Sequence, residues 1–181
     1  SEDEKALRES KKTTDEIRKR VTEMEKRSRE VVKEIRDIIE RVLREVRRVL
    51  EEIRKKKDSR EELDKLLREL EKLVKDVVKE VTELVDRDRE LNKEVVKELR
   101  RLLEEDERLV EEVVRRIEKD KNSEAKKRLK DSLDRTRKTV EEMTRRLEKT
   151  VKETEDLLRE ARERLEELLR ELERVADEKR R

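Results

Sequence analysis

The chain contains no glycine, proline, cysteine, histidine or aromatic residue among its 181 positions. Glycine and proline are the residues that most destabilise a helix interior, so their absence predicts long uninterrupted helices. The absence of cysteine excludes disulfides and thiolate chemistry. Without glycine and aromatic residues, the chain also lacks the loops that cradle phosphates and the rings on which nucleic-acid bases stack.

These absences bear directly on catalysis. No cysteine or histidine is available for nucleophilic or acid–base chemistry, and no serine lies in a glycine-containing elbow. Di-iron bundles use Glu-x-x-His pairs on facing helices, which this chain cannot supply. We therefore expect no enzymatic activity, no cofactor, no bound metal and no small-molecule substrate.

The residues that are present are mostly charged. Asp, Glu, Lys and Arg make up 61% of the chain, yet 56 basic and 54 acidic residues leave a formal net charge of only +2. So small a net charge provides no strong field for nucleic acid or a membrane surface. Opposite charges recur four residues apart, as in Glu112 with Arg116, which is typical of a solvated helix face.

Apolar residues account for 30% of the chain and never form a long run. No uninterrupted apolar segment approaches the ~18 residues of a membrane span. We expect a soluble protein that resides in the cytoplasm of an expression host, although the sequence leaves its compartment unknown.

Two short segments interrupt the helical pattern. At the first, Ser59 is predicted to cap the following helix, with Glu62 completing a Ser-x-x-Glu capping box. At the second, Asn122 is suited to the left-handed conformation at a helix end, and Ser123 is predicted to cap the last helix. The predicted helices span residues 2–57, 60–120 and 124–180.

The apolar spacing predicts how these helices pack. In segment 60–120 the core positions advance by about 3.6 residues per step, which fits a straight helix better than the 3.5 of a left-handed supercoil. Additional apolar neighbours widen the stripe beyond a two-helix seam. We therefore predict an all-α fold: an elongated up-down-up three-helix bundle of nearly straight helices with weak supercoiling, forming a single domain over residues 1–181.

Polar residues are concentrated in one half of the predicted bundle. If short loops connect antiparallel helices, two residues at the same height along the bundle have residue numbers with a constant sum. This sum is about 117 for a residue of the first helix and one of the second, and about 243 for a residue of the second helix and one of the third. Asp106 then comes level with Ser10 and Thr136, and Asp88 with Ser28 and Thr154. The set of candidate core polar residues is Ser10, Thr14, Ser28, Asp88, Asn92, Asp106, Thr136, Thr150 and Thr154.

Two interpretations of these residues differ in what they imply. The functional interpretation is a ligand, metal or proton site, because a carboxylate among hydroxyls can bind a hard cation through oxygen. The structural interpretation is stronger: buried polar groups penalise wrong registers and wrong oligomers, because mispairing would leave donors unsatisfied. In that case Asn92 extends the Asp88 cluster towards Thr150. The alternative is that the acids lie level with hydroxyl residues by coincidence, because about half of the core positions in this region are Ser or Thr.

The near-exclusive use of helix formers, the Val/Ile/Leu core, the Asp-Ser and Asn-Ser junctions and the polar residues at core positions occur together over the whole chain. In this combination the chain resembles de novo designed parametric helical bundles with buried hydrogen-bond networks. The resemblance implies a structural scaffold without natural activity, in which polar layers encode specificity.

An association module is the second hypothesis: half of a designed heterodimer, a subunit of a homo-oligomer, or a switch. It rests on residues 1–30, whose apolar residues are few, so that the N-terminal half of the first helix is displaceable. A monomer needs no partner, whereas a module would bind itself or a designed helical partner. A spacer or membrane-shaping module would need one face biased in charge, and the sequence shows none.

Overall fold

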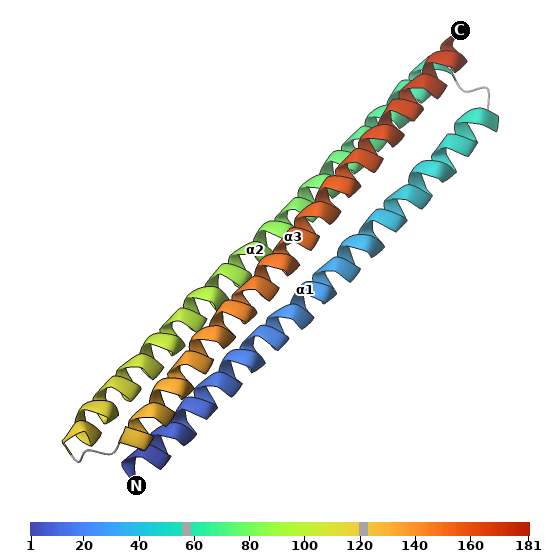
Figure 1. Cartoon of the computed structure of the whole chain (residues 1–181). Coiled ribbons are helices and arrows are strands. Elements are labelled where there is room, and N and C mark those ends of the chain that lie inside the picture. The colour runs from blue at the N-terminus through green and yellow to red at the C-terminus, as the bar shows by residue number, and fades with distance from the viewer. Residues whose placement is uncertain (56–58, 120–122) are drawn as a thin grey trace. The chain divides into compact units, whose positions relative to one another are not determined.

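The fold consists of three long α-helices, and the computed structural model describes residues 1–55, 59–119 and 123–181. Helix α1 spans Glu2–Lys55, α2 spans Arg60–Glu118 and α3 spans Ser123–Arg180 (Figure 1). Within those ranges every regular element is helical. The predicted all-α three-helix bundle is therefore confirmed.

The helix ends differ slightly from the predicted ones. Helix α1 is described to Lys55, so its predicted end at residue 57 lies outside the described residues. Helix α2 ends at Glu118, and Lys119 is in a turn, whereas the predicted end at 120 also falls outside them. Helix α3 begins at Ser123, one residue earlier than predicted.

Contacts between the helices define two compact units. The first unit comprises residues 1–28 and 89–151, and the second comprises residues 29–88 and 152–181. Each unit contains a segment of all three helices. The single domain predicted over residues 1–181 stays a prediction.

The second unit is built around one apolar cluster. Its buried residues come from every helix and are almost all Ile, Val and Leu, with Ile35, Val46, Ile53 and Val85 fully enclosed. Burying such side chains contributes about 1.5–3 kcal/mol each. This unit therefore derives its stability mainly from a continuous hydrocarbon interior.

The first unit has two smaller apolar clusters. One includes Ala6, Val110 and Leu129. The other includes Ile17, Leu99 and Met143. Along each helix, buried or half-buried polar residues lie between the residues of these two apolar clusters. The interior of this unit therefore has a polar layer between two apolar clusters.

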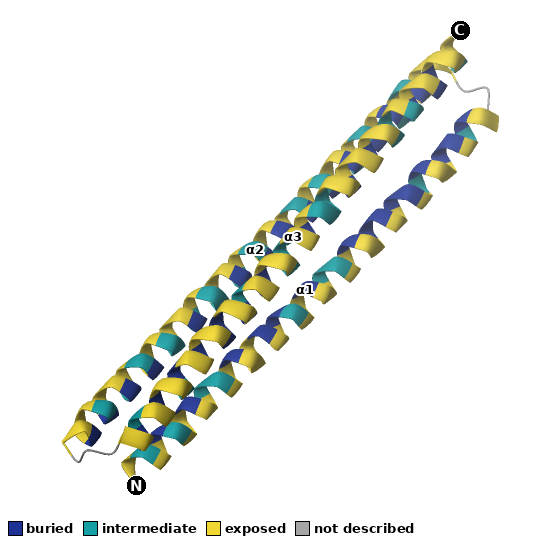
Figure 2. Ribbon diagram, in the orientation of Figure 1, coloured by how far each residue is buried: buried dark blue, intermediate teal, exposed yellow. Residues whose placement is uncertain are grey.

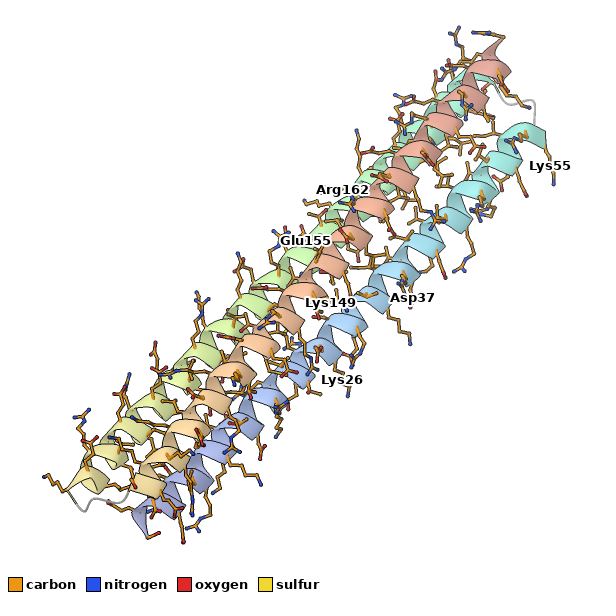
Figure 3. The ribbon with its side chains drawn as sticks, viewed as in Figure 1. Lys26, Asp37, Lys55, Lys149, Glu155 and Arg162 are labelled. Atoms are coloured by element: carbon orange, nitrogen blue, oxygen red, sulfur yellow. The ribbon has the colours of Figure 1, made fainter. Side chains whose placement is uncertain are left out.

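Buried and exposed residues alternate along each helix with helical periodicity, so that each helix has one buried face (Figure 2). No large apolar side chain is exposed in the described parts of the chain. Charged side chains cover the outer faces, as Lys26, Asp37, Lys149 and Glu155 illustrate (Figure 3). This distribution explains how a chain that is mostly charged still encloses a core.

Polar contacts within each unit define the register of the helices. In the first unit, α2 forms two ion pairs with α3, Glu107–Arg137 and Glu118–Lys126. The two residue numbers in each pair add up to 244. In the second unit the pair Thr82–Arg162 has the same sum.

The α1–α2 register is defined by two ion pairs in the first unit. Glu2–Arg116 and Arg20–Glu98 both have positions that add up to 118. Both sums agree to within one residue with those expected from short loops. Helix α2 therefore runs antiparallel to α1 and α3 in the first unit and to α3 in the second. This agreement places the predicted core positions opposite one another.

Candidate functional site

Five polar side chains meet in the interior of the first unit, and we call them the Asp106 layer: Ser10, Thr14, Asp106, Ser132 and Thr136. Helix α1 contributes two of them, α2 one and α3 two. Ser10, Asp106 and Thr136 are each at most 1% exposed, and the other two are half-buried. The layer lies at positions where a Leu or Val would otherwise continue the core.

Two hydroxyl pairs join α1 to α3 across this layer. Ser10 Oγ lies 2.7 Å from Ser132 Oγ, and Thr14 Oγ1 lies 3.1 Å from Thr136 Oγ1. Both pairs are separated by 122 residues in the sequence. Because the two helices are parallel in this unit, a single register satisfies both contacts at once.

Both threonines also bond within their own helices. Thr14 Oγ1 donates to the Ser10 carbonyl at 3.2 Å, and Thr136 Oγ1 donates to the Ser132 carbonyl at 3.1 Å. Bonding to the carbonyl one turn earlier is common for Thr in a helix, because that oxygen is always within reach. The four hydroxyl residues of the layer are consequently connected through the two cross-helix contacts and the carbonyls of Ser10 and Ser132.

Asp106 is the acidic member of the layer. Ser10 and Thr136 lie beside its carboxyl group, as the predicted register requires. Burial raises the pKa of Asp106 above its ordinary value of 3.8, and the neighbouring charge of Glu107 raises it further. The Ser10 and Thr136 hydroxyls lie close enough to oppose this rise through hydrogen bonding, but they do not overcome it. Neither contact meets both the distance and the angle of a well-formed hydrogen bond to a carboxylate oxygen.

The second predicted cluster is divided between the units. Ser28 and Asn92 are buried in the first unit, where Asn92 Nδ2 donates to Ser28 Oγ at 3.4 Å. Asp88 and Thr154 are both buried in the second unit. Thr150 is half-buried, and its hydroxyl donates to the Arg146 carbonyl of its own helix at 2.9 Å. The expected extension from Asn92 towards Thr150 stays a prediction.

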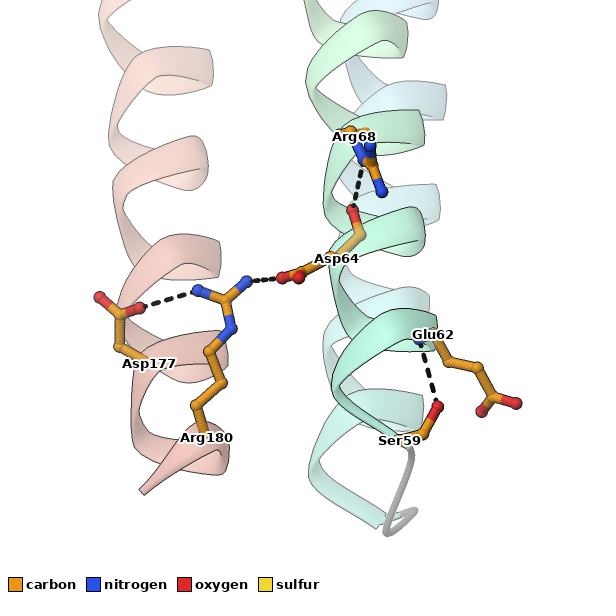
Figure 4. A network of polar contacts seen from close by, with 6 residues as sticks. All are labelled: Ser59, Glu62, Asp64, Arg68, Asp177 and Arg180. Carbon is orange, nitrogen blue, oxygen red and sulfur yellow. Dashed lines mark hydrogen bonds and ion pairs between the residues drawn. The ribbon is translucent and has the colours of Figure 1, made fainter.

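The helix caps are only partly described. At the start of α2, the Glu62 backbone N–H donates to Ser59 Oγ at 3.4 Å, and the Leu63 N–H donates to the Ser59 carbonyl at 3.1 Å. The Glu62 carboxylate points away from Ser59, so the return half of the predicted capping box is missing (Figure 4). Asn122 lies outside the described residues, and Ser123 is the first residue of α3.

Three polar residues that are not among the candidate core polar residues predicted from the sequence also form hydrogen bonds. Ser132 completes the pair with Ser10, and Thr139 is buried with its hydroxyl on the Arg135 carbonyl at 2.8 Å. Thr82 accepts a bond from Arg162 Nη2 at 2.9 Å. The signal for Ser132 was available, because Ser132 and Thr136 repeat the four-residue spacing of Ser10 and Thr14.

One surface hollow of the second unit contains ion pairs. A hollow between α2 and α3 in the second unit is lined by Asp64, Asp177, Arg180 and neighbouring side chains. Arg180 bonds both Asp64 and Asp177 there, so these charges are already paired (Figure 4). In the described portions of the chain, no group of three or more acidic residues is placed to hold a metal ion. No helix there combines the length and apolarity needed to cross a bilayer.

Comparison with known proteins yields the fold and little more. No protein-family model matches the chain, and no curated protein matches it either. Among solved structures, the chain is similar to one described as a computationally designed three-helix bundle. The two share 20% sequence identity with a TM-score of 0.50, over 98% of this chain and 88% of the other. At that identity the similarity shows a common fold, a bundle of three long helices.

Proposed function

We propose that the chain is a designed structural scaffold without catalytic activity, in which buried polar residues specify how the helices pair. The observation that carries this proposal is the Asp106 layer. Each of its hydroxyl pairs has one buried and one half-buried member, and both pairs join the same two helices in one register. The fold shared with a computationally designed bundle supports the same conclusion.

The physical basis of the specificity is the cost of an unsatisfied buried group. A hydroxyl buried without a partner costs about 1–3 kcal/mol. Sliding α1 along α3 by one turn, about four residues, would keep only one hydroxyl contact, because either Thr14 would come opposite Ser132 or Ser10 would come opposite Thr136. In either case one serine hydroxyl loses its partner, whereas the threonines keep the bonds to their own helices, so the penalty of that serine favours the observed register.

The oligomeric state tests the scaffold proposal. Size-exclusion chromatography with light scattering should give a mass near 22.2 kDa that does not change with protein concentration. The absence of exposed large apolar side chains in the described residues supports this expectation. A mass that is a multiple of 22.2 kDa, or one that rises with concentration, would contradict it.

A designed association module is the second candidate, and one observation favours it. In the first unit, several apolar residues of α2 are only half-buried: Leu91, Val95, Val96, Leu102, Leu103, Leu109 and Val114. Facing them, the α1 segment of that unit has few apolar residues. An additional helix, from a second copy or a designed partner, would cover the remaining apolar surface.

Hydrogen exchange distinguishes the two candidates. If the N-terminal half of α1 is displaceable, amides of residues 1–28 will exchange with an opening free energy well below that of global unfolding. Residues 35–55 of the same helix provide the internal control, since they pack on the large apolar cluster. Equal protection in both segments would reject the displaceable segment.

A further inference from the structure

Asp106 is a buried acid whose charge nothing in its described surroundings balances. Asp106 is 1% exposed, and the contacts of its oxygens with the Ser10 and Thr136 hydroxyls fall short of well-formed hydrogen bonds. An ionised carboxylate can accept about four hydrogen bonds, and burial without them is costly. The ionised form is therefore poorly suited to this site.

The surrounding hydroxyls have few protons to supply to the carboxylate. Thr14 and Thr136 have one hydroxyl proton each, and these two protons already serve the carbonyls of their own helices and the 3.1 Å contact between the two threonines. The contact between Ser10 and Ser132 uses one of their two protons. At most one proton of the layer remains for the carboxylate, whereas every hydroxyl oxygen retains capacity to accept. The layer is short of donors and rich in acceptors.

The charged groups facing Asp106 do not neutralise it. From α2, the adjacent Glu107 repels its charge, and Glu107 itself is paired with Arg137 at 3.3 Å. The inward-facing residues of α1 between Ala6 and Ile17 are uncharged, and so are those of α3 between Leu129 and Val140. Within the described residues, no cation therefore reaches the carboxyl group from any of the three helices.

We propose that Asp106 is a proton-binding site that stabilises the first unit as the pH falls. The proton comes from solvent and forms an O–H bond on one carboxyl oxygen. That O–H then donates to the Ser10 or Thr136 hydroxyl, whose oxygen accepts. The neutral acid supplies the donor that the layer lacks, and the charge of the buried group disappears.

The raised pKa of Asp106 is consistent with this site and sets the sign of the pH effect. Because the pKa is higher in the folded protein than in the unfolded chain, the stabilisation is fully present below the unfolded value. It is lost as the pH rises through the folded value. Each unit between the two pKa values corresponds to about a tenfold change in the folding equilibrium constant.

The location of the layer extends the effect to the whole unit. Asp106 lies on α2 between the cluster containing Val110 and the cluster containing Leu99. Loss of the proton places a charge between these two apolar groups of residues. Opening of the first unit, which would hydrate that charge, is therefore favoured at higher pH.

A direct titration of the full-length protein tests the site. The Asp106 side-chain carboxyl carbon is followed by NMR of uniformly 13C-labelled protein, with its resonance assigned from the wild-type backbone. We expect a titration midpoint clearly above 3.8. A midpoint at or below this value would overturn the proposal, and this measurement needs no variant.

The linkage to stability is tested with Asp106→Asn, which is similar in shape but cannot titrate. Urea unfolding is followed by far-ultraviolet circular dichroism from about pH 4 to about pH 8. The ratio of wild-type to variant unfolding constants should rise as the pH rises. The matched control is Asp131→Asn, which removes an exposed carboxyl of α3 and should parallel the wild type. A wild-type to Asp106→Asn ratio that does not change with pH would contradict the linkage.

Discussion

The hydroxyl oxygens of Ser10 and Ser132 lie 2.7 Å apart inside the first unit, although 122 residues separate them in the sequence. The same separation recurs between Thr14 and Thr136. Two contacts with one spacing mean that the parallel helices α1 and α3 are held in a single register by hydroxyl groups. Apolar side chains alone discriminate less sharply, because hydrocarbon contacts are not directional.

The Ser10–Ser132 pair should show strong energetic coupling. Replacing Ser132 with alanine removes the partner of the buried Ser10 hydroxyl and should lower the free energy of unfolding by about 1–3 kcal/mol. Replacing Ser10 removes the partner of a half-buried hydroxyl and should cost less. Replacing both removes the unsatisfied group, so the double variant should lose less than the sum of the single variants. Urea unfolding of the four proteins measures this coupling.

Thr13→Ala is the matched control for that cycle. Thr13 is only half-buried, and its hydroxyl bonds the Glu9 carbonyl of its own helix. Its replacement should change stability by less than about 0.5 kcal/mol. Additive effects of Ser10→Ala and Ser132→Ala would show that the pair does not act as a unit.

The cap at Ser59 should make a modest contribution to α2. Its hydroxyl accepts from the Glu62 N–H at 3.4 Å, which is long for a hydrogen bond, and the return bond from the Glu62 side chain is missing. Ser59→Ala should therefore cost nearer the lower limit of the usual 0.5–2 kcal/mol, about 0.5 kcal/mol. Thermal unfolding of Ser59→Ala and of Ser59→Asn, which retains a capping group, provides the comparison. Equal losses in the two variants would mean that the cap is not responsible.

The contact between Thr82 and Arg162 is expected to matter little for stability. The Thr82 hydroxyl already donates to the Val78 carbonyl at 2.7 Å, and Arg162 is exposed. Arg162→Ala therefore leaves no buried group without a hydrogen-bond partner. It should change the unfolding free energy by less than about 0.5 kcal/mol. A loss above about 1.5 kcal/mol, measured by urea unfolding, would show that this contact anchors α3 to α2.

Much of the helical architecture is predictable from the sequence because it depends on local rules. Without glycine or proline, the only interruptions lie near Ser59 and Ser123, and both match the observed helix starts to within one residue. The short junctions then determine the register, which brings Asp106 beside Ser10 and Thr136.

The hydrogen bonds inside the layer were not predictable in the same way. Register places Asp106 level with two hydroxyls, but each hydroxyl also has a carbonyl of its own helix within reach. Thr136 bonds its own helix and also contacts Thr14, and neither Asp106 oxygen has a well-formed hydrogen bond. Thr150 likewise bonds the Arg146 carbonyl. Competition between local and cross-helix acceptors depends on side-chain rotamers, which residue spacing does not determine.

Replacing the whole Asp106 layer with apolar residues tests most directly whether buried polar groups specify the helix pairing. The variant combines Ser10→Ala, Thr14→Val, Asp106→Leu, Ser132→Ala and Thr136→Val. Its unfolding free energy should rise, by about 1–4 kcal/mol if it resembles other replacements of buried charges. Light scattering across a range of concentrations is the deciding measurement. We predict a wild-type mass constant at 22.2 kDa and additional, larger species for the variant. A variant that remains entirely at 22.2 kDa, with the same helix register by NMR, would contradict the proposed role of the layer.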